Sequence, residues 1–555
     1  MSGAAAAGSQ LDASTKRLVL VACILGTTVV TVDATVVNVA LPSIASDLGG
    51  GLAGQQWTAN AYLVTLGSLL LLGGSLGDLY GERRVFALGV TAFGVTSIFC
   101  AVAPTIGLLV LGRALQGVAG AVLTPAALAV IVATFPPAER GRAVGAWTAW
   151  GGIGTVLGPL IGGQLVDTAS WRWIFAVNVP LVVVTVVMIL RVVPPGRERP
   201  ADARLDLVGG ALCASGLALM TFGLIEQPLH GWGSAMVALP LAVGAILFCA
   251  FLLWESRVPA PMLPLALFRR RNFAIGNIET FSMYGGLGLV FFFLILFLQQ
   301  VAGFTALEAG TSSLPVTAMM FLLSARFGAL ADRHGPRFFM GVGPLVAAVG
   351  LLLLRRLDTE VDYLTDLLPA LLVFGVGLSM TVAPLTATVL ADADESNAGI
   401  ASGVNNAIAR VAGLVAIAAV GALVAASFAS SLDDKLGGRG PQVAAAVERA
   451  KRRPLSEVDV RGVPVSSRAD VTEAGEEASV QAFRLGLSIS TVLVALGGVL
   501  GLVGIVNPRR RVEAEDCAGG QLAGASTESA RQSPCEWREQ SRALTATSLR
   551  VVREG

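Results

Sequence analysis

Four charged residues interrupt apolar stretches and are the side chains best placed to do chemistry. Asp33 lies in TVVTVDATVVNVALP and Arg113 in LLVLGRALQG, and two later apolar runs contain Glu279 and Arg410. Burying a lone charge in an apolar medium is costly, and a partner of opposite charge lowers that cost. Such residues either bind and release protons or form static pairs that fix helix packing.

The sequence offers few residues for metal binding, disulfide formation or catalysis. The chain has two histidines, His230 and His334, and its six cysteines include no CxxC motif and no framework spacing. We therefore expect no metal site, no disulfide, no cofactor and no enzymatic activity.

Composition indicates an all-α polytopic membrane protein. The chain has 555 residues, of which 54% are hydrophobic and 14% charged, and its mean hydropathy is +0.72. A bilayer core of about 30 Å needs about 20 apolar residues in a helix. Apolar runs of this length predict fourteen spans, at 18–40, 57–77, 85–103, 107–133, 143–166, 173–193, 206–225, 235–254, 273–299, 310–330, 338–356, 367–390, 399–428 and 484–506.

The charges of the short loops predict the orientation. With the N-terminus in the cytoplasm, inner segments contain seventeen Lys and Arg residues and outer loops three. This bias predicts a plasma-membrane protein with both termini cytoplasmic. Residues 1–17 would form the inner N-terminus, which precedes a retained first helix, not a signal peptide. Residues 429–483 would form a long external loop, and residues 507–555 a cytoplasmic, disordered tail.

An internal repeat divides the spans. GSLGDLYGERR is echoed by GALADRHGPR, TPAAL by APLTA and GRAVG by GIASG, in the same order and at nearly one offset. We infer two pseudo-symmetric six-helix bundles, 18–193 and 273–506, with two inserted helices at 206–254. Paired bundles that move about a central site suit alternating access.

Several motifs taken together resemble the major facilitator superfamily, specifically its fourteen-spanner drug:proton antiporter group. The motifs are DATVVNVALP from Asp33, GSLGDLYGERR from Gly74, LGRALQG from Leu111, GTVLGPLIGG from Gly154, WRWIF from Trp171 and NVP from Asn178. The resemblance covers residues 18–428 and the last span. It implies the major facilitator fold and a transporter driven by the proton gradient. The second loop motif departs from the pattern at Ala331 and Pro336.

Helical rise predicts which buried charges can meet. Asp33 would lie about 12 Å and Arg113 about 10 Å below the outer surface, so the two can pair. Protonating Asp33 would then release Arg113, and the alternative is a static polar lock. Glu279 and Arg410 form a weaker second set, because Glu279 can instead face an inner vestibule and stay solvated. We predict Asp33, Arg113 and Glu279 as proton-coupling residues.

Two glycine-containing motifs predict conformational roles. The repeated loop motif suggests a latch on the cytoplasmic side, or merely a basic loop that sets topology; its residues are Gly74, Asp78, Gly81, Arg83, Arg84 and Asp332. The fifth span contains a small-residue face that lets a partner helix pack closely, formed by Gly154, Gly158, Pro159, Gly162 and Gly163. The resemblance ties this face to export; by spacing alone it is ordinary helix packing.

For the substrate cavity we predict Trp147, Asn277 and Tyr284, three polar or aromatic residues near mid-depth. The expected partners are small hydrophobic or cationic substrates, protons and the lipid bilayer, with no nucleic acid. The favoured function is proton-coupled efflux of drugs or antibiotics. Alternatives are export of an endogenous lipid or secondary metabolite, a nutrient importer, a membrane sensor and a membrane enzyme. The last two lack a signalling domain and clustered catalytic residues.

Overall fold

The computed structural model describes residues 12–194, 206–259, 261–391 and 398–507. Residues 1–11 of the predicted N-terminus and residues 508–555 of the predicted tail lie outside these residues. The helices of the first bundle are α1 (Ala13–Leu48), α2 (Gly51–Tyr80), α3 (Glu82–Ala101), α4 (Ile106–Thr134), α5 (Pro137–Thr168), α6 (Trp173–Ala176) and α7 (Asn178–Val192). Then follow α8 (Leu207–His230), α9 (Ala235–Glu255), η1 (Leu265–Arg269), α10 (Arg271–Gln300), α11 (Ala306–Ser312), α12 (Leu314–His334), α13 (Pro336–Leu354), η2 (Tyr363–Leu367), α14 (Leu368–Ala391), α15 (Ala398–Leu436), α16 (Pro441–Lys451) and α17 (Val465–Gly504).

The described residues form an all-helical membrane protein. Twelve stretches are long and apolar enough to cross a bilayer. The helices α2 and α5, with 30 and 32 residues, are not among the twelve, although both lie at predicted spans. The count of fourteen therefore stays a prediction.

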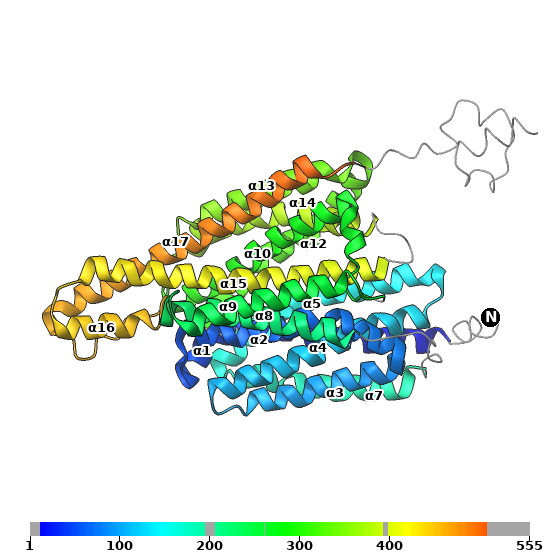
Figure 1. Cartoon of the computed structure of the whole chain (residues 1–555), viewed down its shortest axis with the longest axis horizontal. Helices are drawn as coiled ribbons and strands as arrows, with labels where there is room; N and C mark the ends of the chain where they lie inside the picture. The colour runs from blue at the N-terminus through cyan, green and yellow to red at the C-terminus, as the bar shows by residue number, and fades with distance from the viewer. Residues whose placement is uncertain (1–11, 195–205, 260, 392–397, 508–555) are drawn as a thin grey trace, which may run out of the picture. The chain divides into compact units, whose positions relative to one another are not determined.

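Helix contacts follow the same plan in the two halves. In the first, α1 packs on α5 and α7, and α4 packs on α2 and α3; in the second, α10 packs on α15 and α17, and α14 on α12 and α13. We call the side of the bundle on which α1 begins the near side, and the side on which it ends the far side. Figure 1 shows α13 and α17 diverging from α1–α4 toward the near side.

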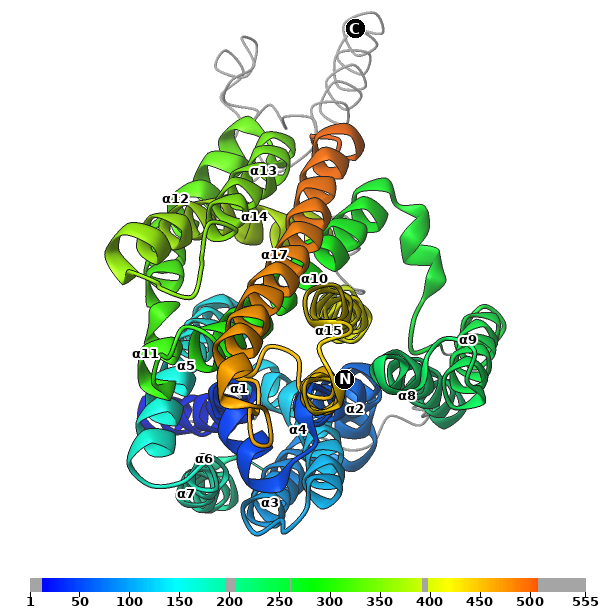
Figure 2. The ribbon, with the colours of Figure 1, turned by 90° about the vertical axis from the view of Figure 1, so that its left-hand side faces the viewer.

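The inserted helices α8 and α9 form a hairpin at the edge of the two bundles. Helix α8 contacts α2 of the first bundle and α15 of the second, whereas α9 packs mainly on α8 (Figure 2). The cluster that joins them includes Val64, Leu217, Phe251 and Leu414. The hairpin therefore bridges both halves of the repeat.

The segment 429–483, predicted as an external loop, is mostly helical. Helix α15 continues to Leu436, α16 spans Pro441–Lys451, and α17 begins at Val465. Apolar residues such as Val447, Leu455 and Val471 are buried and belong to the same core cluster as the second bundle. The segment is polar in overall composition, which favoured a loop, but apolar side chains within it are buried together and stabilise the helices.

Candidate functional site

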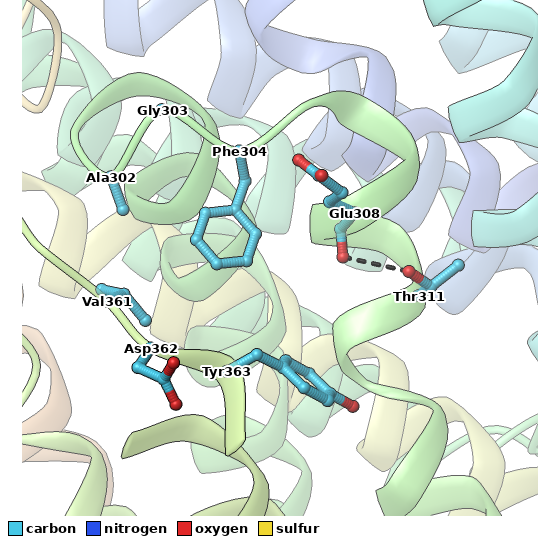
Figure 3. Close-up of a pocket in the computed structure, with 8 residues that line it drawn as sticks. All are labelled: Ala302, Gly303, Phe304, Glu308, Thr311, Val361, Asp362 and Tyr363. Atoms are coloured by element: carbon cyan, nitrogen blue, oxygen red, sulfur yellow. Dashed lines mark hydrogen bonds between the residues drawn. The ribbon is translucent and has the colours of Figure 1, made fainter. Parts of the chain in front are cut away.

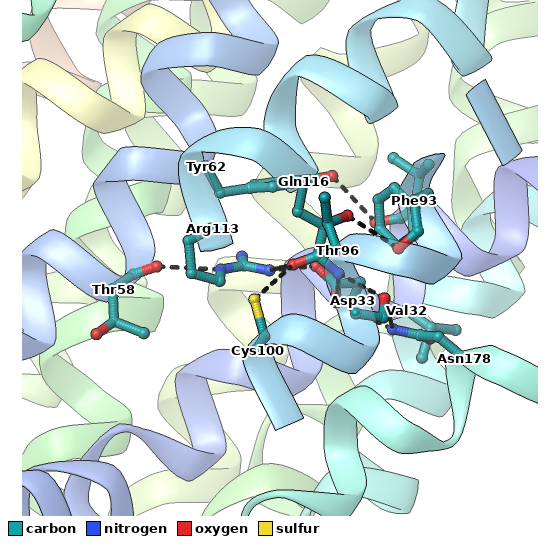
Figure 4. Close-up of polar contacts among 12 residues, drawn as sticks. Val32, Asp33, Thr58, Tyr62, Phe93, Thr96, Cys100, Arg113, Gln116 and Asn178 are labelled. Carbon is teal, nitrogen blue, oxygen red and sulfur yellow. Dashed lines mark hydrogen bonds and ion pairs between the residues drawn. The ribbon is translucent and has the colours of Figure 1, made fainter. Parts of the chain in front are cut away.

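The first bundle buries an ion pair at its centre. Arg113 Nη1 on α4 donates to Asp33 Oδ2 on α1 at 2.5 Å, and the two side chains are 1% and 0% exposed (Figure 4). The shared depth predicted from helical rise is therefore accompanied by direct contact. Whether the pair couples to protons stays a prediction.

Amide side chains complete the coordination of the acid. Asp33 Oδ1 accepts hydrogen bonds from Gln116 Nε2 at 2.8 Å and Asn178 Nδ2 at 3.1 Å. Both amides also donate to Ser97 Oγ on α3, at 2.9 and 3.3 Å. The carboxyl group thus receives hydrogen bonds from α4 and α7, which lower the cost of burying it.

The guanidinium is equally enclosed. Its Nε donates to the Thr58 carbonyl at 3.2 Å, and Nη1 also donates to Gln116 Oε1 at 2.7 Å. The ring of Tyr62 lies 4.4 Å from its central carbon, at a distance suited to a cation–π contact. Helices α1, α2, α3, α4 and α7 therefore meet at one polar network.

Sequence reasoning missed Gln116 and Asn178 as members of this network. Gln116 follows Arg113 by three positions, which places both on one face of α4. That spacing was a usable signal. Asn178 is the first residue of α7, and apart from its NVP motif the sequence contained no signal for its place in the network.

The second predicted pair is absent. Glu279 on α10 is 0% exposed, which also excludes the solvated alternative, and neither carboxylate oxygen has a hydrogen-bond partner among the described residues. It faces α17, where a Cβ on Gly501 would lie 2.9 Å from its Oε2. Arg410 lies against α2, since a Cβ on Gly67 would be 3.3 Å from its own Cβ. The two residues point to different helices.

The predicted cavity residues do not form one described cavity. Trp147 Nε1 donates to Thr27 Oγ1 at 2.8 Å, which ties α5 to α1. Asn277 is buried and accepts a hydrogen bond from Asn405 of α15 at 3.2 Å. Tyr284 is half-buried against the main core cluster. Their role in substrate binding stays a prediction.

The predicted latch residues lie at the near side. Gly81 has φ 86° between α2 and α3, and a Cβ on Gly74 would lie 3.8 Å from Pro125. Arg83 Nη2 donates to the Leu190 carbonyl at 2.5 Å. The side chain of Asp78 is outside the described structure, and Arg84 and Asp332 are exposed. The latch role of these residues stays a prediction.

The glycines of α5 do form a packing seam. A Cβ on Gly154 or Gly158 would lie 2.4 or 2.0 Å from a threonine hydroxyl of α1, and one on Gly162 would lie 2.4 Å from Val36. Gly163 faces the other bundle, with its Cβ position 2.4 Å from Cα of Leu307. The seam thus joins α5 both to α1 and to α11.

Hydrogen bonds join the two bundles on the far side. The Asp167 carboxylate of α5 accepts from the backbone N–H groups of Ala306 and Leu307 at 3.0 and 2.8 Å. Gln299 donates to the Val39 carbonyl at 3.0 Å, and Gln56 to the Ile417 carbonyl at 2.8 Å. In contrast, α12 buries only two of its residues, Val316 and Ala331. We call the Asp167 contact with α11 the far-side junction.

A cavity of about 500 Å³ lies beside this junction, between the α10–α11 loop and the segment before η2 (Figure 3). Its carboxylates already cap helices. Glu308 accepts from the Thr305 backbone N–H at 2.9 Å, and Asp362 accepts from Leu364 and Thr365 at 3.0 and 2.9 Å. The cavity walls are thus stabilised by its own acids.

Comparison with known proteins decides the family. A model of the Major Facilitator Superfamily matches residues 23–417. The chain belongs to the Major Facilitator Superfamily. Over 441 residues it is 34% identical to the tetracenomycin C resistance and export protein of Streptomyces glaucescens, covering 78% of this chain and 81% of that protein. Over 500 residues it is 32% identical to the multidrug resistance protein Stp of Mycobacterium tuberculosis, covering 87% and 90%.

The fold agrees with the superfamily assignment. A bacterial homologue of the human lysosomal transporter Spinster, solved in an inward-facing and unoccupied conformation, superposes with a TM-score of 0.62 at 16% identity. The match covers 90% of this chain and 100% of that one. The superfamily fold predicted from the motifs is thereby confirmed.

Breaking the buried ion pair should destabilise the protein strongly. We expect Asp33→Asn and Arg113→Gln each to cost about 3–5 kcal/mol, because each leaves a buried polar partner uncompensated. The double variant should be destabilised by clearly less than the sum of the two single-variant losses. Thermal unfolding of the purified protein measures this. Asp47→Asn, which breaks the exposed pair with Arg172 at 2.6 Å, is the control and should cost under about 1 kcal/mol. Additive losses would contradict the network.

Gly158→Ala should lower the melting temperature. The added methyl would meet the Val32 carbonyl at 2.9 Å, and overpacking of this kind costs about 1–3 kcal/mol. Gly145→Ala on the same helix meets nothing within 4 Å and should be neutral or slightly stabilising. Equal melting temperatures for the two variants would show that the seam is not tight.

Asp167→Ala should open the far-side junction. A cysteine placed at the buried Ala309 of α11, in a background without the native cysteines, should react several-fold faster with a membrane-impermeant maleimide, because two hydrogen bonds worth about 1 kcal/mol each are lost. Asp47→Ala removes another far-side acid and should leave the rate unchanged. An unchanged rate in Asp167→Ala would refute the junction.

Proposed function

We propose that this chain exports hydrophobic or cationic drugs and antibiotics across the plasma membrane in exchange for protons. The observation that carries the proposal is that, among the described residues, each bundle buries a carboxylate within a membrane span, Asp33 in α1 and Glu279 in α10. Intramembrane acids are costly and typically mark ion or proton pathways. The export and multidrug resistance proteins among its relatives support drugs as the substrate class.

The orientation follows from the basic residues of the loops. The short segments predicted to be cytoplasmic contain seventeen Lys and Arg residues, and the outer loops contain three. We therefore assign the near side, on which α1 begins, to the cytoplasm. Both termini then lie in the cytoplasm. In this orientation the far-side junction would face outward, which supports a state closed to the outside, with the bundles diverging toward the cytoplasm.

The exchange of substrate for protons uses the charge of the ion pair. When Asp33 takes up a proton, its carboxylate loses the charge that holds Arg113, and the hydrogen bonds from Gln116 and Asn178 weaken. Rearrangement of this network changes how α1, α4 and α7 pack. A cationic substrate near the pair would favour the ionised acid, so substrate and proton oppose each other. No cofactor and no chemical conversion of the substrate is needed.

Transport by everted vesicles tests this function. Imposing a proton gradient, acidic inside, should drive accumulation of ethidium, tetraphenylphosphonium or antibiotics by the wild type, followed by fluorescence or radiolabel. Asp33→Asn should lose most of the gradient-driven component, whereas Asp47→Asn should keep it. Accumulation that is independent of the gradient would sink the antiport proposal, and full activity of Asp33→Asn would remove Asp33 from coupling.

A further inference from the structure

Glu279 is a buried acid that the second bundle leaves without a partner. Its side chain is 0% exposed, and both carboxylate oxygens lack a hydrogen bond among the described residues. Asp33, in contrast, has three side-chain donors. An ionised carboxylate without compensation in an apolar interior costs many kcal/mol, so such a group is buried as the neutral acid.

The helices around Glu279 pack too closely to admit solvent in this state. On α17, a Cβ on Gly501 would lie 2.6 Å from the Met340 carbonyl of α13, and one on Gly497 would lie 3.8 Å from Glu279 Cγ. About two turns before Gly497 on the same helix, Ser490 Oγ donates to the Gly286 carbonyl of α10 at 2.9 Å. We call this contact between α10 and α17 the Glu279 seam.

Both guanidinium groups at the cytoplasmic end of the seam are engaged in closing it. Arg271 Nε donates to the Gly504 carbonyl at 2.8 Å, and Arg337 Nε donates to the Leu502 carbonyl at 2.5 Å. These bonds cap the last turn of α17, where free carbonyls remain. Neither guanidinium bonds to Glu279 in the described structure.

The elements that face the seam bring no counter-charge to Glu279. No charged side chain occurs in residues 485–504 of α17, 338–354 of α13 or 368–391 of α14. On α15, Arg410 lies against Gly67 of α2, and the charged residues Asp433, Asp434 and Lys435 lie about 40 Å farther along the helix than Asn405. The neighbouring polar groups are the amides Asn277 of α10 and Asn405 of α15. On α10 itself the nearest charge is Arg271, about 12 Å away along the helix.

We propose that Glu279 is a second proton-binding site of the transport cycle, separate from the Asp33–Arg113 pair, and that α10 and α17 close over it only when it carries a proton. The inference rests on the proposed antiport. In the closed state the proton is held in the O–H bond of the acid. When the seam parts on the cytoplasmic side, water reaches the carboxyl group, accepts the proton and leaves a hydrated carboxylate. The two bundles thus differ in that Asp33 pairs with Arg113, whereas Glu279 has no counter-charge among the described residues.

Glu279→Gln tests the proposal, because glutamine has the shape of the protonated acid and cannot release a proton. In everted vesicles we expect this variant to keep downhill exchange of ethidium within about twofold of wild type and to lose gradient-driven accumulation at least tenfold. Glu279→Asp, which restores an acid, should recover part of the accumulation. Glu360→Gln, at an exposed residue of the far side, is the charge-matched control and should behave as wild type.

A second readout needs no transport. The melting temperature of the purified wild type should fall as the pH is raised, because the closed seam holds a proton that the ionised form lacks, and Glu279→Gln should remove that part of the decline. Gradient-driven accumulation by Glu279→Gln equal to wild type would overturn the inference, as would equal loss of exchange and accumulation. If wild type shows no gradient dependence but its melting temperature still depends on Glu279, the antiport fails and the proton site stands.

Discussion

A buried carboxyl group with three side-chain hydrogen-bond donors constrains the helices packed around it. The Asp33 carboxylate accepts from Arg113, Gln116 and Asn178, so α1 can only sit where α4 and α7 bring those donors within about 3 Å. Such close approach requires small residues at the helix crossings. Gly154 and Gly158 provide it between α5 and α1, and Gly117 provides it between α4 and α2, where a Cβ would lie 2.3 Å from the Tyr62 carbonyl. The polar network therefore depends on the close helix packing that these glycines allow.

The two halves share an architecture and differ in chemistry. Arg83 of the first loop motif donates to the Leu190 carbonyl at the end of α7, and Arg337 of the second copy donates to the Leu502 carbonyl near the end of α17. The repeat is thus preserved where it fixes the ends of helices. In the centre, the first bundle contains a buried ion pair, and the second contains Glu279, whose carboxyl oxygens have no hydrogen-bond partner among the described residues. Under the proposed antiport, the pair in the first bundle would respond to a charged ligand, and Glu279 in the second would respond to protons.

The sequence predicted those features that depend on position along a helix. Hydropathy located the helices, and the 1.5 Å rise placed Asp33 and Arg113 at one depth. Depth does not give direction around the helix axis, so Glu279 and Arg410 were paired wrongly: one faces α17 and the other α2. The far-side junction was not predicted either. Asp167 accepts hydrogen bonds from backbone N–H groups of α11, and a sequence does not show which backbone groups a side chain will bind. The helical extension between α15 and α17 was hidden by its polar composition.

In the proposed cycle, substrate binding and protonation of the buried carboxyl groups oppose each other, and proton release on substrate binding measures this most directly. Titration calorimetry of ethidium into the purified protein, in two buffers of different ionisation enthalpy, gives the number of protons exchanged per substrate bound. The account predicts net proton release by the wild type and none by the Asp33→Asn, Glu279→Gln double variant. Binding by the wild type with no proton release, or with proton uptake, would contradict it.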